Sequence, residues 1–97
     1  MKTLNEVTEI LRAHKAELER KYRIKEIRIF GSYVRGEQKK RSDIDLLVDF
    51  YEVPDLFRFI EIEEYLKSLL GLNVDLVRRP VVREELRDEI LKEAVVV

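Results

Sequence analysis

"FGSYVRGEQKKRSDIDLLVDF", residues 30–50, combines a glycine-serine pair with two aspartates inside a stretch that otherwise reads as a buried β-strand. Residues two apart on a strand point to the same face of a sheet. Asp43 and Asp45 therefore face the same way, while Ile44 and Leu46 face the core. We expect the two carboxylates to converge at one place on the sheet surface.

The apolar residues on both sides of this stretch predict alternating helices and strands. Apolar positions three and four apart predict a helix over 4–22, and a β-branched run predicts a strand over 24–30. The remaining expected elements are a helical turn at 32–36, a strand over 42–50, a helix that Pro54-Asp55 opens and Gly71 ends, a strand over 73–77, and a helix after Pro80 marked by Leu86, Ile90, Ala94 and Val97. The order α-β-α-β-α-β-α indicates an α/β fold whose small sheet carries helices on at least one face.

Two apolar groups affect how these elements pack. The helix that ends at Gly71 has one apolar face, formed by Leu56, Phe59, Ile62, Leu66 and Leu69. The last three residues, 95–97, are all valine. A frayed tail, a plug for the core and part of an interface all stay open for them.

Length and composition restrict the class of protein. The 97 residues fit a single domain, 1–97, with one modest core. Charged residues make up 40% of the chain but nearly cancel to a net charge of -1, so we expect neither stable nucleic-acid binding nor attachment to a membrane surface. Cysteine is absent, which excludes disulfides and thiolate chemistry. The charged stretch 1–20 has no continuous apolar run, so we expect a cytoplasmic protein.

Paired carboxylates on one strand face suit divalent cations better than the alternatives. A calcium loop needs polar residues and a glycine between its acids, and a glycosidase needs a wide sugar cleft and one protonated acid. Asp75, between Val74 and Leu76, repeats the pattern on a later strand and is a candidate third ligand. Carboxylates about 4 Å apart repel by roughly 4 kcal/mol per pair at an effective dielectric near 20. Bound Mg²⁺ would remove this repulsion.

Each of these acids taken alone is better explained as a solvent-facing residue at a strand end. Asp49, close to the far end of its strand, receives that interpretation outright, as a turn residue. His14 lies on the apolar stripe of the first helix and is interpreted as a packing residue.

The pair Gly31-Ser32 directly follows a strand, where a glycine lets a phosphate approach the backbone and a helix start offers free N–H groups. Taken alone, this pair is more often a plain turn. Arg35 lies on the same side of the helical turn, where it either holds a triphosphate oxygen or pairs with an acid. Ser42 either orients the carboxylate of Asp43 or begins the strand with a local hydrogen bond.

Together, GSYVRG at 31–36 and SDIDLLV at 42–48 resemble the signature of the minimal nucleotidyltransferases of the DNA polymerase beta-like superfamily. The resemblance spans nearly the whole chain and implies a small mixed β-sheet flanked by helices. It implies that Gly31-Ser32, with Arg35 and Ser42, binds a nucleotide. It further implies that Asp43, Asp45 and Asp75 are catalytic and hold Mg²⁺, with two ions expected. Val34 stands where the family commonly has a smaller residue such as alanine.

The resemblance also implies the reaction. A hydroxyl attacks the α-phosphorus of a nucleoside triphosphate, most simply ATP, and expels pyrophosphate, with Asp75 helping to activate the hydroxyl. Members this small resemble antitoxins that add AMP to a tyrosine of a HEPN-domain ribonuclease toxin, which is the expected partner. A binding antitoxin that covers its partner without catalysis, and an aminoglycoside-type transferase that needs a dimer to complete its cleft, stay as alternatives. The sequence leaves homo-oligomerisation open.

Overall fold

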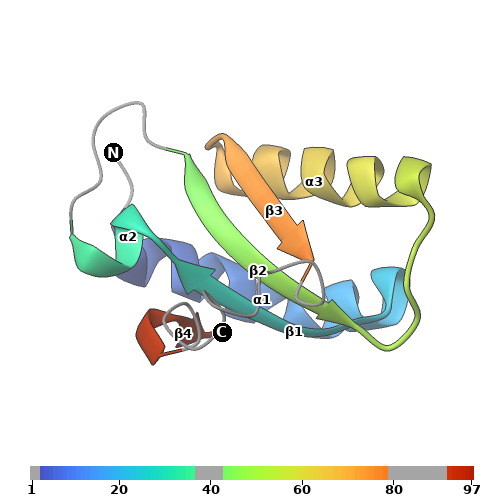
Figure 1. Cartoon of the computed structure of the whole chain (residues 1–97), viewed down its shortest axis with the longest axis horizontal. Coiled ribbons are helices and arrows are strands. Elements are labelled where there is room, and N and C mark those ends of the chain that lie inside the picture. Colours follow the sequence, from blue (N-terminus) through green and yellow to red (C-terminus); the bar gives the residue numbers. More distant parts are fainter. Residues whose placement is uncertain (1–2, 37–42, 79–91) are drawn as a thin grey trace.

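The chain forms a mixed four-stranded β-sheet flanked by helices, seen in a computed structural model that describes residues 3–36, 43–78 and 92–97. Its elements are α1 (Leu4–Tyr22), β1 (Ile24–Phe30), α2 (Ser32–Arg35), β2 (Ile44–Phe50), α3 (Leu56–Leu70), β3 (Val74–Arg78) and β4 (Val95–Val96). The strand order is β3-β2-β1-β4 (Figure 1). β2 runs parallel to β3, whereas β1 is antiparallel to both β2 and β4.

Local sequence signals account for the helix boundaries. Thr3 caps α1 by accepting a hydrogen bond from the Glu6 amide, and Arg23 ends the helix with a left-handed φ of 59°. Asp55 caps α3 through the Arg58 amide at 2.8 Å, and Gly71 ends it with a φ of 67°. The predicted helices at 4–22 and between Asp55 and Gly71 are confirmed.

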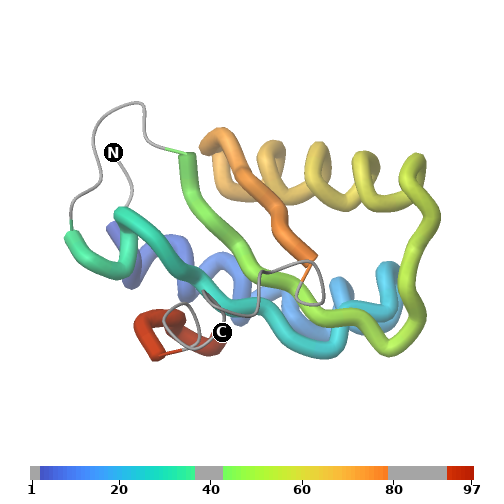
Figure 2. The backbone as a smooth tube through the Cα atoms, viewed as in Figure 1, coloured from blue at the N-terminus to red at the C-terminus, as the bar shows by residue number. Residues whose placement is uncertain are grey.

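Both long helices contribute to one core on the same side of the sheet. β2 points Ile44, Leu46 and Val48 into this core, and all three side chains are fully buried. α1 and α3 contact each other there, because Tyr65 of α3 packs on Tyr22 of α1 with ring centroids 5.5 Å apart. Figure 2 shows α1 passing behind β1 and β2, while α3 runs beside β3.

The buried face of α3 differs from the predicted one. Ile62, Leu66 and Leu70 are fully buried, but Leu56 is 69% exposed. The first turn of α3 therefore lies outside the core, and the prediction that Leu56 shares the face of Ile62 and Leu66 is wrong. A helix of 15 residues that covers a small sheet can bury only the part of its length that lies over the strands.

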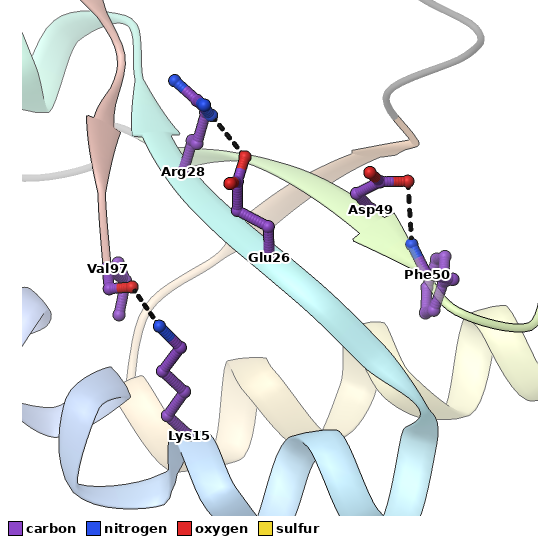
Figure 3. A network of polar contacts seen from close by, with 6 residues as sticks. All are labelled: Lys15, Glu26, Arg28, Asp49, Phe50 and Val97. Carbon is purple, nitrogen blue, oxygen red and sulfur yellow. Dashed lines mark hydrogen bonds and ion pairs between the residues drawn. The ribbon is translucent and has the colours of Figure 1, made fainter.

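The carboxyl-terminal valines plug the core from one edge of the sheet. β4 pairs with β1, and the buried Val97 donates its amide to the carbonyl of Ile27 at 3.0 Å. Lys15 of α1 donates to the carbonyl oxygen of Val97 at 2.9 Å (Figure 3). The prediction that a final helix continues to Ala94 and Val97 is therefore wrong, since β-branched residues favour the pleated edge.

The rest of that expected helix, including Pro80, Leu86 and Ile90, lies outside the described residues. Lys92 and Glu93, just before the edge strand, are helical. Within the described ranges, no helix is both long and apolar enough to cross a bilayer.

Candidate active site

Two aspartates face each other on the side of the sheet away from α1 and α3. β2 and β3 are parallel and in register, so Asp45 lies directly opposite Asp75. Their neighbours Ile44 and Leu46 on β2, and Leu76 on β3, point into the core. The alternation of side chains along each strand therefore sends both carboxylates to the face of the sheet opposite this core.

The chain leaves β1 beside these two aspartates. Phe30, the last residue of β1, pairs with Asp45 across the antiparallel ladder. The next residue, Gly31, has φ 79° and ψ -149°, a backbone conformation that is essentially restricted to glycine. A Cβ atom at this position would collide with Oδ2 of Asp45 and lie 3.0 Å from its Cγ. The backbone of the Gly31 turn therefore lies in close contact with the Asp45 carboxylate.

The carboxylates around Asp45 disfavour its ionised form. Burial first, then the charges of Asp75 and Asp43, raise the pKa of Asp45 to about 6, and a hydrogen bond between Asp45 and Asp75 acts in the same direction. The guanidinium of Arg35 opposes them and favours the charged form. A raised pKa that combines burial with neighbouring carboxylates is typical of functional sites and is compatible with a cation site.

The first turn of α2 follows Gly31 and presents backbone N–H groups, which are hydrogen-bond donors suited to an anion. The amides of Val34 and Arg35 donate to the Gly31 carbonyl, at 3.1 and 3.3 Å. Ser32 and Tyr33 precede them in the first turn, where amides have no acceptor within the helix. Ser32 is half-buried, whereas the Tyr33 side chain is 2% exposed and belongs to the core.

Arg35 approaches an acid that sequence reasoning missed. Its Nη1 lies 3.5 Å from Oε2 of Glu93, and both side chains are about half exposed. Arg35 was predicted either to hold a triphosphate oxygen or to pair with an acid. The structure shows a pair with an acid. Glu93 lies 58 residues away along the chain, and no local pattern in the sequence links the two positions.

The predicted site residues are brought together only in part. Asp45 and Asp75 are in contact beside Gly31, with Arg35 close enough to influence Asp45. Asp43 is exposed, lies just before β2 and contributes its charge to the same field. Ser42 lies outside the described residues.

The acidic side chains at this place are the kind of donors that Mg²⁺ prefers. Carboxylate oxygens are the ligands that Mg²⁺ takes from proteins, usually one or two of them together with substrate phosphates. The contact between Asp45 and Asp75 supplies two such groups. Within residues 3–36, 43–78 and 92–97, no three acidic, histidine or cysteine side chains are close enough together to hold a metal ion.

A mixed sheet with a Gly-Ser turn packed on paired strand aspartates is the arrangement of a nucleotidyltransferase. The model of the nucleotidyltransferase domain family matches residues 11–97, so the chain belongs to this family.

Similar sequences and structures indicate which branch of this family the chain resembles. The chain is 53% identical over 97 residues to the protein adenylyltransferase MntA of Thermococcus cleftensis, covering 100% of this chain and 98% of that protein. A solved structure of a candidate minimal nucleotidyltransferase matches with a TM-score of 0.82 and 33% identity, over 97% of this chain and 95% of the other. A toxin-antitoxin crystal structure with AMP-PNP matches with a TM-score of 0.69 and 27% identity, over 95% of this chain and 69% of the other. The chain is therefore a homologue of MntA-type protein adenylyltransferases.

Proposed function

We propose that the protein is a Mg²⁺-dependent adenylyltransferase that moves AMP from ATP onto a tyrosine hydroxyl of a HEPN-domain ribonuclease toxin and thereby acts as an antitoxin. The chain, 1–97, acts as a single catalytic domain in the cytoplasm, where ATP is available. The 53% identity to a protein adenylyltransferase over the full chain supports the reaction. The 27% identity to a toxin-antitoxin complex that holds AMP-PNP supports the partner and the nucleotide.

The contact of Gly31 with Asp45 is the observation that carries this proposal. Any side chain at residue 31 would collide with the Asp45 carboxylate, so glycine is what allows the backbone of this turn to lie against the acid. A bare backbone beside a carboxylate lets phosphate oxygens and a cation share one small space.

In this mechanism the chain binds and orients the triphosphate. The amides of the first turn of α2 and the Ser32 hydroxyl donate hydrogen bonds to phosphate oxygens, and Arg35 exchanges Glu93 for the triphosphate. Asp43, Asp45 and Asp75 hold Mg²⁺, which when bound neutralises charge on the triphosphate and so favours attack at phosphorus.

The acceptor oxygen forms a bond to the α-phosphorus while the bond from that phosphorus to the bridging oxygen breaks. Pyrophosphate leaves with the electron pair of the broken bond. Asp75 is exposed on the face of the sheet opposite the core and accepts the proton of the acceptor hydroxyl. Most of the rate acceleration then comes from positioning and electrostatic stabilisation.

The test mixes the purified protein with Mg²⁺, α-labelled ATP and the product of the adjacent gene. We expect the label to move to a tyrosine of the partner and the partner's ribonuclease activity to fall in parallel. Leaving out Mg²⁺, or using a variant that carries both Asp43→Ala and Asp45→Ala, removes both effects.

The same experiment separates the two alternatives. Partner inhibition without label, retained in the double variant, would contradict catalysis and identify a binding antitoxin. Label that moves to an aminoglycoside and not to protein would contradict the proposed acceptor.

A further inference from the structure

The segment that forms the edge strand β4 also brings an acid to the candidate active site. β4 is antiparallel to β1, and Val95 lies opposite Ile29. Because the two chains run in opposite directions, the residues before this pair on one strand lie beside those that follow it on the other. Glu93 precedes the pair by two residues, and Gly31 follows it by two (Figure 1). The topology therefore places Glu93 at the level of the Gly31 turn.

The side chain of Glu93 pairs with Arg35, the cation that the proposed function assigns to the triphosphate. Oε2 of Glu93 lies 3.5 Å from Nη1 of Arg35, and the two side chains are 51% and 45% exposed. The Arg35 guanidinium also acts electrostatically on Asp45, whose charged form it favours. Arg35 is thus under the influence of one acid inside the candidate site and of another at its border.

The contact between Glu93 and Arg35 is of a kind that exchanges easily. It is long and exposed, so water competes for both partners and the pair is weak. A triphosphate carries several negative charges, and its oxygens accept paired hydrogen bonds from a guanidinium. The triphosphate therefore displaces the Glu93 carboxylate. The displaced carboxylate still lies close to an anionic ligand and repels it.

We propose that Glu93 lowers the affinity of the protein for the nucleoside triphosphate by competing with its phosphates for Arg35. This inference rests on the proposed function, because it requires a triphosphate in the candidate site. Glu93 is a positioning residue that acts through Arg35. It holds the guanidinium at the border of the site before the nucleotide binds, and it pairs with the guanidinium again when pyrophosphate leaves.

Isothermal titration calorimetry on the purified full chain tests this proposal. The ligand is an ATP analogue with a methylene group between the α- and β-phosphorus, added with Mg²⁺, because it binds without transfer of AMP. Glu93→Gln should lower the Kd of this analogue about threefold, which is within the range expected when one exposed ion pair no longer competes. The decrease should become smaller at about 0.5 M salt, which screens exposed charges.

Glu64→Gln is the matched control. Glu64 also forms an exposed ion pair, with Lys67 at 3.3 Å, but it belongs to α3, which packs on the other face of the sheet. This variant loses the same charge and a similar contact, so its Kd for the analogue should equal that of the wild type. Circular dichroism checks that both variants fold, as expected for carboxylates that are 51% and 64% exposed.

A double-mutant cycle tests whether Glu93 acts through Arg35. In an Arg35→Gln background, Glu93→Gln should change the Kd by less than it does in the wild-type background, because the two residues are in contact. Equal changes in the two backgrounds would overturn the proposal, since the carboxylate would then act on the nucleotide by its charge alone.

The remaining outcomes separate this inference from the proposed function. An unchanged Kd in folded Glu93→Gln would overturn the inference, and so would a higher Kd, which would show that the ion pair prepares Arg35 for the nucleotide. The expected decrease in a protein that transfers no AMP to its partner would support the inference and overturn the proposed function. Failure of every variant to bind the analogue would overturn both.

Discussion

The two ends of β2 place an aspartate on the same face of the sheet but surround it differently. Asp45, near the beginning, faces Asp75 across the parallel ladder and lies against the backbone of Gly31. Asp49, four residues later, lies opposite Glu26 in the antiparallel ladder and accepts a hydrogen bond from the amide of Phe50 at 3.0 Å.

At the Asp49 end of β2, the acidic side chains have hydrogen-bond or ion-pair partners close to them in the sequence. Figure 3 shows Glu26, Arg28 and Asp49 projecting from the side of the sheet away from α1. Arg28 donates to Glu26 at 2.5 Å, so the acid opposite Asp49 has a cation of its own. The prediction that Asp49 is a turn residue is wrong, because it lies inside β2 and is half-buried.

From this difference we propose that Asp49 is a structural acid and Asp45 a functional one. Repulsion that the fold leaves in place costs stability, and such costs are concentrated where a protein binds or reacts. The same residue type on the same strand face is therefore expected to matter for chemistry at position 45 and little at position 49.

The largest expected effect is on adenylyl transfer. Asp45→Asn should lower the rate of label transfer to the partner by at least about 100-fold, since it removes a charged group from the centre of the site. Asp49→Asn, the matched change at the other end of the strand, should stay within about twofold of the wild type. Equal losses in both variants would abolish the distinction between the two ends.

The next effect concerns the close approach of the turn to Asp45. Gly31→Ala should lower the free energy of unfolding by about 2 kcal/mol, because alanine disfavours this backbone conformation and its Cβ collides with Asp45. It should also abolish nucleotide transfer. Chemical denaturation measures the first result and the labelling assay the second.

Gly36→Ala is the matched control for this substitution. Gly36 also has a positive φ, of 70°, but a Cβ there would meet nothing within 4 Å. We expect a loss of about 1 kcal/mol from backbone strain alone and retained transfer. A Gly31→Ala protein that is as active as Gly36→Ala would contradict the proposed phosphate site.

The smallest expected effect is a pH-dependent difference in stability between Asp45→Asn and the wild type. Burial and the neighbouring acids raise the pKa of Asp45 to about 6 in the folded protein, above the ordinary value of 3.8. The folded state therefore binds this proton more tightly than the unfolded state. Protonation of Asp45 therefore stabilises the folded state. This contribution is fully present below about pH 4 and is lost as the pH rises through 6.

Without Mg²⁺, Asp45→Asn should consequently have a free energy of unfolding higher than that of the wild type at about pH 8, by about 1 kcal/mol once solvent screening of this partly exposed group is considered, and should therefore unfold at a higher temperature. The difference should vanish at about pH 4, and Mg²⁺ should reduce it at pH 8 by stabilising only the wild type. Thermal melts at the two pH values measure it. A variant that is less stable than the wild type at pH 8 would show that the acids do not repel one another.

Much of the fold could be predicted because its signals are local. The caps Thr3 and Asp55, the glycine at 71 and the alternation along β2 all act within a few residues of themselves. The contact between Asp45 and Asp75 depended on a further assumption, that two strands 30 residues apart lie side by side. The resemblance to a known family and the repeated pattern of an acid between apolar residues supported that assumption.

Other features had no local signal. The three valines at the end of the chain fit a helix, a tail or a strand equally well, and only pairing with β1 selects the edge strand. The exposure of Leu56 depends on where α3 extends past the sheet, because the helix period alone does not indicate which turns are covered. The contact of Arg35 with Glu93 joins two residues that are 58 positions apart in the sequence and that only the folded sheet brings together.

The sequence by itself determined the two long helices and the first three strands, and which face of β2 and β3 carries the acids, because side-chain direction follows from backbone periodicity. The tertiary structure alone decided that β3 lies beside β2 in a register that sets Asp75 against Asp45, and that Gly31 closes on the same carboxylate. Register and close approach arise from packing between distant segments, whose free energy no single segment contains.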